Sequence, residues 1–283
     1  MKAFRPKSYK PARKVTRSKG KAFNPATGTT VNRSDGSAGG RKPVNHAPKI
    51  LHGGSSAVST IFDAPLKGLI NSMSGLVTYL PMDGLNGTVV NQSPNNTNPG
   101  VASNITLADG KVGKSFAFNG TNSGVALSNT TFPSTDFSVL CLVKRSGTQE
   151  ASDRLIDYAA GGPDGGFDIL FPTGNVNKLR LGIWNTTVLE ASISTDADLT
   201  DGQWYLVVGT YTANSAKFYL NATQQGATDT AVTCSAPAAQ SVNIGKRSAA
   251  GTNYFTGNIQ HFALFSRVLT QQEVTDLAAV AGV

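Results

Sequence analysis

The sequence predicts an all-β protein, a two-sheet antiparallel sandwich with a short C-terminal helix, preceded by a short helix and an extended basic N-terminal arm. Three observations predict this fold class. From residue 76 onward, short apolar or alternating runs are separated by Gly, Asn, Asp and Pro, as in antiparallel sheets. No long helical pattern lies between these runs, which favours a sandwich over an α/β fold. The charge is also unevenly distributed and separates an arm from a body.

The arm, residues 1–55, is defined by its charge. Residues 1–50 contain 13 Lys and Arg against one acid, Asp35, a formal charge of +12, whereas the other 233 residues contain 12 Lys and Arg against 16 Asp and Glu, a charge of −4. The arm has few large apolar residues, so burial cannot offset its ordering entropy. We expect it to anchor the protein to an anionic or acidic surface. The anchoring cations are Lys2, Arg5, Lys7, Lys10, Arg13, Lys14, Arg17, Lys19, Lys21, Arg41 and Lys42.

Residues 56–75 read as a linker with a short amphipathic helix. Asp63 is placed to cap a helix that starts at Pro65, since proline is favoured at the first helical position. Apolar side chains then follow at helical spacing until Gly75. They are Leu66, Leu69, Ile70 and Met73. Because so short a helix does not persist alone in water, this stripe docks either on the chain's own body or on a neighbouring subunit.

The body, residues 76–283, contains the predicted strands and ends in one helix. The strands are predicted over Leu76–Leu80, Ser115–Phe118, Ser138–Lys144, Arg154–Tyr158, Phe167–Phe171, Leu179–Trp184, Thr187–Ile193, Trp204–Tyr211, Ala216–Leu220, Ser241–Ile244 and Gly257–Phe265. Thr270 and Glu273 form a T-x-x-E capping box that starts the final helix. Trp204 follows an Asp-Gly turn, and we expect it to be a core residue.

Five segments of the body carry a family resemblance, in the same order along the chain. They are LVTYLPMDG (76–84), KVGKSFAFNGTNSGVAL (111–127), DFSVLCLVKRS (136–146), DGQWYLVVGTYTANSAKFYLNATQQG (201–226) and IGKRSAAGTNYFTGNIQHFALFSRVLTQQEV (244–274). With these, the body resembles the laminin-G-like, concanavalin A-like lectin/glucanase sandwich found in phage and bacterial surface proteins. The resemblance covers residues 76–280 and implies a jelly-roll-type sandwich.

The resemblance includes both lectins and hydrolases, so the acidic residues must distinguish them. The hydrolases place carboxylates on alternate residues of one strand, as E-x-D-x-x-E, because alternate residues share a face. No such string occurs, and Glu150, Asp153 and Asp157 lie near one another without that register. The only histidines are His46, His52 and His261, which do not suggest a nucleophile–His–acid set. We therefore expect no enzymatic activity and no cofactor.

The resemblance also implies a calcium site, which needs several oxygen ligands including carboxylates. The matching positions are neutral here: Asn91, Asn95, Asn122, Ser123, Gln260 and His261. Asp83 keeps its acid but is explained equally well as a turn residue. We expect no metal site, with weak Ca²⁺ binding around Asp83, Asn91 and Asn122 as the alternative.

Carbohydrate binding would use aromatic and amide side chains at one end of the sandwich. The candidates are Trp184, Asn185, Tyr254 and Phe255. Packing in the core or at a strand end explains each of them at least as well.

Arm and body together suggest a non-enzymatic structural protein of a large assembly. We expect a virion protein of a phage or virus, decorating the capsid or forming a spike or fibre, an assignment made by analogy. Its partners would be other assembly subunits or copies of itself, with nucleic acid through the arm and surface glycans through the sandwich as further partners. Two alternatives stay open: a stand-alone carbohydrate-binding adhesin at a cell surface, and a cytoplasmic nucleic-acid- or ribosome-associated protein. No run of 18 apolar residues occurs, so we expect no membrane span.

Overall fold

The computed structural model describes residues 22–24, 29–31, 56–84, 88–89, 100–128, 130–131, 133, 135–158, 165–236, 241–247 and 252–283. The chain divides into two compact units, Met1–His52 and Gly53–Val283. Within the first unit, strands β1 (Ala22–Asn24) and β2 (Thr29–Val31) form a short antiparallel pair, which the sequence reading did not predict. The anchoring cations of the arm lie outside the described residues.

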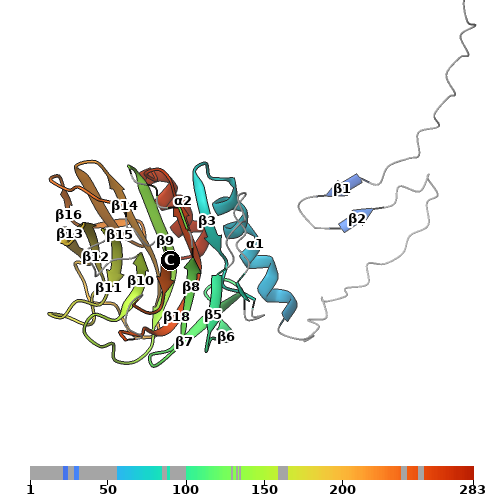
Figure 1. Ribbon diagram of the computed structural model, residues 1–283. Helices are drawn as coiled ribbons and strands as arrows, with labels where there is room; N and C mark the ends of the chain where they lie inside the picture. Colours follow the sequence, from blue (N-terminus) through green and yellow to red (C-terminus); the bar gives the residue numbers. More distant parts are fainter. Residues whose placement is uncertain are drawn as a thin grey trace, which may run out of the picture. The chain divides into compact units, whose positions relative to one another are not determined.

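The second unit is an antiparallel sandwich of two sheets, which confirms the predicted fold class (Figure 1). One sheet, here called the open sheet, has the order β13-β12-β11-β10-β17-β8-β5-β4. Its strands are β13 (Val188–Ser194), β12 (Arg180–Asn185), β11 (Gly166–Leu170), β10 (Arg154–Tyr158), β17 (Ser241–Ile244), β8 (Gly124–Ser128), β5 (Gly100–Ser103) and β4 (Thr88–Val89).

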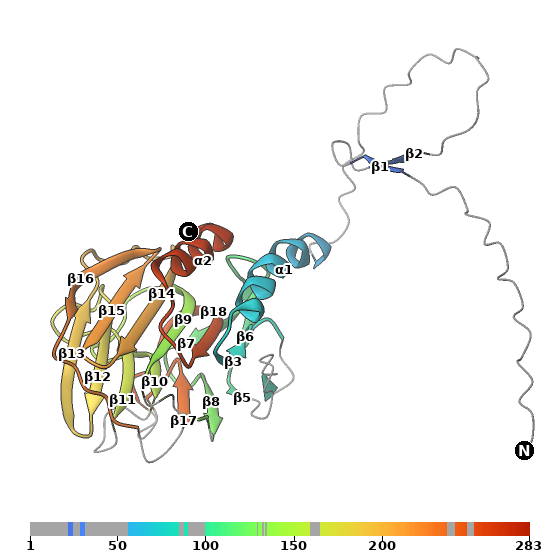
Figure 2. The same cartoon turned by 90° about the horizontal axis from the view of Figure 1, so that it is seen from above.

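The other sheet, here called the covered sheet, has the order β16-β15-β14-β9-β18-β7-β6, with β3 paired to β18. Its strands are β16 (Thr223–Asp229), β15 (Ser215–Leu220), β14 (Trp204–Thr212), β9 (Phe137–Arg145), β18 (Thr256–Phe265), β7 (Lys114–Asn119), β6 (Thr106–Asp109) and β3 (Leu76–Leu80). Figure 2 separates the two layers and shows helices α1 (Ser56–Ser72) and α2 (Gln271–Ala281) along the covered sheet, on the side away from the open sheet.

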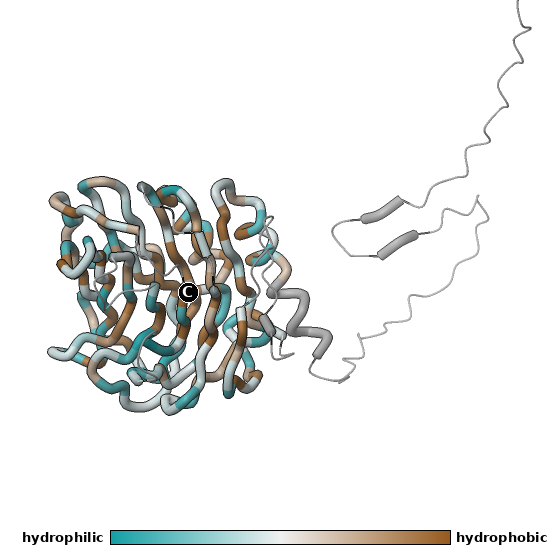
Figure 3. The backbone as a smooth tube through the Cα atoms, in the orientation of Figure 1, coloured by the Kyte–Doolittle hydropathy of each residue, from teal (hydrophilic) through white to brown (hydrophobic). Residues whose placement is uncertain are grey.

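Strand β9 explains why the covered sheet is apolar on both faces. Val139, Cys141 and Val143 point into the core between the sheets, whereas Leu140 and Leu142 point the other way, into a second apolar cluster beneath the helices. Alternate residues of a strand lie on opposite faces, so a strand buried on both sides reads as one continuous apolar run. Figure 3 shows these hydrophobic segments running through the sandwich.

Helix α1 begins earlier than the sequence suggested. We expected a start at Pro65 with Asp63 as the cap, but the helix runs from Ser56 and contains Pro65. Proline is favoured at the first position of a helix, but it can also lie inside one, where it removes one backbone hydrogen bond and its ring crowds the carbonyl of the preceding turn. Buried contacts beyond Pro65 hold that part of the helix: Leu66 and Ile70 are fully buried in the second cluster.

The apolar stripe of α1 packs on the chain's own body. Leu69 and Met73 pack at the edge of the cluster that buries Leu66 and Ile70, and α1 contacts both α2 and β3. Neither helix in the described part of the chain has the length and hydrophobicity needed to cross a bilayer.

Helix α2 has the predicted capping box. The Thr270 side chain accepts a hydrogen bond from the Glu273 backbone amide, and the Glu273 carboxylate accepts one from the Thr270 amide. The Glu273 carboxylate also forms a two-pronged ion pair with Arg267, at 2.6 and 2.8 Å. Gly282, with φ of +70°, ends the helix in the left-handed conformation that glycine adopts without strain.

Candidate functional site

The two outer faces of the sandwich differ in character. The helices cover the apolar outer face of the covered sheet. On the open sheet, no helix of the described residues lies over the outer face, and polar side chains alternate there with core-facing apolar ones. We call this outer face of the open sheet the polar face. Its central polar side chains are themselves buried, whereas Arg180 and Trp184 are partly exposed.

A row of in-register residues crosses the polar face. Asn243 on β17 pairs with Asp157 on β10, which pairs with Asp168 on β11. Asp168 in turn pairs with Gly182 on β12, and Gly182 pairs with Ser192 on β13. Cross-strand partners lie on one face of a sheet and interact directly. The topology therefore brings together residues that are up to 86 positions apart in the sequence.

The centre of this row is a buried ionic cluster. Asp168 is fully buried and accepts a hydrogen bond from Arg180 Nη2 at 2.8 Å. Arg154, with 6% of its side chain exposed, lies between the two acids: its Nη1 is 3.6 Å from Asp168 Oδ2 and its Nε is 3.4 Å from Asp157 Oδ1. Burial lowers the pKa of Arg154, and the carboxylates of Asp168 and Asp157 oppose that shift. Two guanidinium groups thus neutralise two carboxylates on the polar face.

Trp184 is the aromatic residue of this face. Its side chain is half-buried, and its indole Nε1 donates a hydrogen bond to Asp168 Oδ2 at 3.1 Å. The bond connects the ring to the ionic cluster and fixes its orientation. Gly182 makes room for this arrangement, because a Cβ there would lie 2.4 Å from Asp168 Oδ1 and 3.0 Å from Arg180 Nη2. Asp168 therefore positions an arginine and a tryptophan at once.

The four residues that the sequence analysis proposed as glycan contacts lie in different environments. Trp184 lies on the polar face, and the backbone of Tyr254 forms an isolated parallel bridge with that of Arg154. The Asn185 amide donates to Thr233 Oγ1 at 2.8 Å. Phe255 is fully buried between Phe118 and Phe171 in the core, so its assignment as a glycan contact is wrong. Its neighbours in the folded chain supply an apolar environment that the local sequence does not reveal.

The sequence reading missed Arg154, Asp168 and Arg180 as site residues. A usable signal was present in β10 (RLIDY) and β11 (GFDIL), where Asp157 and Asp168 are acidic residues within mostly apolar strands. Sequence alone does not reveal which strands pair, so the two acids could not be placed opposite each other.

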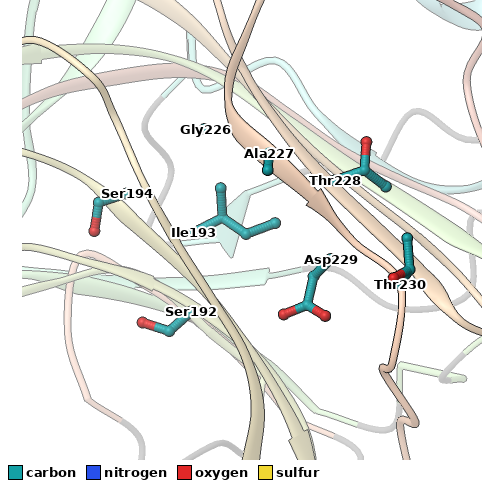
Figure 4. A pocket seen from close by; sticks show the side chains of 8 residues that line it. All are labelled: Ser192, Ile193, Ser194, Gly226, Ala227, Thr228, Asp229 and Thr230. Atoms are coloured by element: carbon teal, nitrogen blue, oxygen red, sulfur yellow. The ribbon is translucent and has the colours of Figure 1, made fainter.

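A pocket lies at the edge of the sandwich where β13 and β16 meet. Its volume is about 390 Å³. Figure 4 shows Ile193 and Asp229 in the space between the two strands. The lining residues are Ser192, Ile193, Ser194, Gly226, Ala227, Thr228, Asp229 and Thr230. Ser192 also ends the row that crosses the polar face, so the pocket adjoins that face.

The positions that would match a calcium site have partners of their own. The Asp83 carboxylate is paired with the Lys67 ammonium. Asn122 Oδ1 accepts from the Asn119 amide, and the Gln260 amide donates to the Val112 and Lys114 carbonyls. His261 Nδ1 lies 2.7 Å from the Tyr79 hydroxyl, and Ser123 Oγ accepts from the Asn119 backbone amide. Asn91 and Asn95 lie outside the described residues. Among the residues described, no group of three or more His, Cys, Asp or Glu is arranged to hold a metal ion.

The remaining residues that the sequence analysis singled out have structural roles. Asp153 accepts a hydrogen bond from the Glu150 amide and closes a loop, apart from the ionic cluster of Asp157. Trp204 packs at the edge of the cluster under the helices, with Lys144 Nζ 5.3 Å from its ring centre. Cys141 and Cys234 are free thiols, and burial raises the pKa of Cys234 to about 12.

Comparison with solved structures finds the same fold in carbohydrate-active and toxin proteins. Domain 4 of the extracellular arabinanase AbnA from Geobacillus stearothermophilus, in complex with arabinotriose, is 23% identical, with a TM-score of 0.58 over 72% of this chain and 98% of that domain. The sialidase of Trypanosoma rangeli in complex with sialic acid is 15% identical, with a TM-score of 0.58 over 78% of this chain. The binding domain of botulinum neurotoxin serotype D is 13% identical, with a TM-score of 0.58 over 72% of this chain.

The extent of these matches limits what they show. This chain spans only 38% of the sialidase and 51% of the toxin domain, and at such identities the likeness establishes the fold alone. No curated protein sequence matches the chain. A laminin G-type family model, described as the concanavalin A-like lectin/glucanases superfamily, matches residues 119–275, more than half of the chain. The match agrees with the two-sheet topology, and the chain belongs to the concanavalin A-like lectin/glucanases superfamily.

Proposed function

We propose that this protein binds carbohydrate through the polar face of its open sheet. The observation that carries the proposal is Trp184, a partly exposed side chain whose indole is held in one orientation by the buried carboxylate of Asp168. A sugar ring offers an apolar C–H face and a rim of hydroxyl groups. An aromatic ring fixed beside charged and amide groups matches both parts, because it combines apolar contact area with hydrogen-bond donors and acceptors.

The ionic cluster supports binding because it holds the side chains of the site in fixed orientations. Arg180, with 16% of its side chain exposed, can offer N–H donors to a ligand, whereas Arg154, Asp157 and Asp168 are buried and pair with one another or with Arg180. Their mutual pairing holds these groups rigid before a ligand arrives, and a preorganised site loses less conformational entropy on binding.

The comparisons support the same class of ligand. The arabinanase domain was solved with arabinotriose, and this chain covers 98% of it. The superfamily includes lectins as well as glucanases. Binding without catalysis fits the cluster better than hydrolysis does, because a glycosidase needs one protonated carboxyl as a general acid. Here each carboxylate of the pair is engaged by a guanidinium, Asp157 by Arg154 and Asp168 by Arg180.

A glycan array tests the proposal. The full chain is applied to an array of neutral oligosaccharides, in parallel with the Trp184→Ala variant and at a salt concentration that suppresses binding by the basic arm. We expect selective binding by the wild type and loss of at least ten-fold in affinity for the variant. Absence of binding to every neutral glycan, or equal binding by the variant, would overturn the proposal.

A second candidate function concerns the arm, and the observation that favours it is the +12 charge of residues 1–50 against −4 for the remainder. In this proposal the arm attaches the sandwich to a large assembly such as a virus or phage particle, so that the sandwich is displayed. Deletion of residues 2–50 tests it: we expect the truncated protein to keep its fold and lose incorporation into particles. Normal incorporation of the truncated protein would rule the anchoring role out.

A further inference from the structure

The pocket between β13 and β16 has no role in the site described so far. We propose that it is a second saccharide subsite, so that the ligand is an extended neutral oligosaccharide that reaches from Trp184 to the edge of the sandwich. This inference rests on the proposed carbohydrate-binding function and deepens it. It is carried by three features: a bulge that forms the pocket, the chemistry of its lining, and its continuity with the polar face.

The pocket is formed by an irregularity in β16. Ala216 of β15 pairs with Asp229, and Phe218 pairs with Gln225, so three residues of β16 stand opposite Lys217 alone. The extra residues bulge out of the ladder at Gly226, which has φ of +59°. Bulges are common at sheet edges, where they bend the strand and change the direction of its side chains. Here the bulged residues, Gly226, Ala227 and Thr228, form one wall of the pocket.

The lining of the pocket suits a neutral polyhydroxy ligand. Four hydroxyl side chains and one carboxylate line it, and no Lys, Arg or His does. The hydroxyl groups both donate and accept hydrogen bonds, and the Asp229 carboxylate accepts from pairs of neighbouring sugar hydroxyls. An anionic ligand would be repelled by Asp229 with no cation to compensate. Ile193, a core residue with 6% of its surface exposed, and Ala227 are the apolar side chains of the lining.

The pocket is continuous with the polar face. Ser192, in the pocket, pairs with Gly182, and Ser194 pairs with Arg180 of the ionic cluster. Trp184 pairs with Leu189 on β13, three residues before Ser192. Ser192 faces Gly182, two residues from Trp184, and a bulge interrupts the register between Ile183 and Trp184, so the Cα atoms of Trp184 and Ser192 lie about 8–11 Å apart. That distance exceeds one sugar ring, so a ligand that occupies both places is a chain of several units.

The test is a nuclear magnetic resonance titration of the ¹⁵N-labelled full chain. The probes are arabinose, arabinotriose and arabinohexaose, with gluco- and xylo-oligosaccharides of one, three and six units. The variants are Trp184→Ala, Asp229→Ala and, as a matched control, Asp276→Ala, an exposed carboxylate on α2. Thermal melts establish that each variant is folded.

We expect an oligosaccharide of three or six units to shift the Trp184 indole signal together with the amide signals of Gly226, Ala227 and Thr228. Asp229→Ala should weaken binding of the six-unit chain at least five-fold and leave monosaccharide binding unchanged, whereas Asp276→Ala should have no effect. If the Trp184 signal shifts while the three amides do not, and Asp229→Ala binds like the wild type, the second subsite is refuted and the proposed function stands. If no sugar shifts the Trp184 signal, the proposed function fails, and the extended ligand with it.

Discussion

Removing the Asp168 carboxylate tests whether the ionic cluster holds the polar face together. Asp168 accepts hydrogen bonds from Arg180 and Trp184 and lies 3.6 Å from the guanidinium of Arg154. Truncation in Asp168→Ala leaves two cations without this partner, and Arg154 is almost completely buried. Breaking a buried ion pair by removing one partner costs about 3–5 kcal/mol. We expect the lower end, because Arg180 is 16% exposed and reaches water more easily.

Urea unfolding of the full chain, followed by fluorescence, measures the effect. With a urea slope of about 3 kcal/mol per molar for a body of this size, a loss of 3–5 kcal/mol lowers the midpoint by roughly 1–1.7 M. Asp168→Asn, which keeps the shape and one acceptor oxygen, should lower it by less. The matched control is Asp109→Asn, which removes an exposed ion pair with Lys114 and should leave the midpoint unchanged. Equal midpoints for Asp168→Ala and Asp109→Asn would refute the account of the cluster.

Three further predictions concern the helices and the arm. Ile70→Ala removes a fully buried side chain of α1 from the cluster on the covered sheet and should lower the free energy of unfolding by about 2–5 kcal/mol. In the same urea assay, Leu69→Ala should cost much less, because Leu69 is less buried. Equal losses for the two variants would contradict the docking of α1. The Arg267 guanidinium holds the pKa of Glu273 at about 2, below its usual 4.5, so the ion pair stabilises the fold above pH 4.5 and this contribution is lost as pH falls toward 2. Thermal melts between pH 6 and 2 should therefore decline less steeply for Glu273→Gln than for the wild type, and identical profiles would exclude the effect. Binding of the full chain to duplex DNA should weaken steeply with salt and disappear on deletion of residues 2–50, because phosphate neutralisation releases counterions; salt-independent binding would argue against an electrostatic arm.

Much of the sandwich could be predicted from the sequence because its central strands are apolar on one or both faces. Leu76–Leu80, Arg154–Tyr158 and Ser241–Ile244 were predicted with the bounds that the structure has. Of the strands that were missed, β6 and β16 lie at sheet edges, whereas β5 and β8 lie inside the open sheet. Edge strands have polar, half-exposed patterns such as those of TLAD and TQQGATD, and these patterns do not differ from those of loops.

The site was less predictable because it depends on pairing across strands. Trp184 was named as a glycan candidate, but its partner Asp168 was not, since the hydrogen bond between them follows from the register of β11 and β12. Phe255 was named wrongly because burial depends on Phe118 and Phe171, both far away in the sequence. The bulge at Gly226 likewise has no local signal that separates it from a turn.

The central claim, that Trp184 contacts a bound sugar, has one direct measurement. The chain contains only two tryptophans, Trp184 and Trp204, so Trp204→Phe makes Trp184 the sole indole reporter and Trp184→Phe makes Trp204 the sole one. Both full-length variants are titrated with the neutral oligosaccharides used above. The account predicts a saturable change in emission for Trp204→Phe and none for Trp184→Phe. Saturable binding detected by calorimetry without any change in the emission of Trp184 would contradict it.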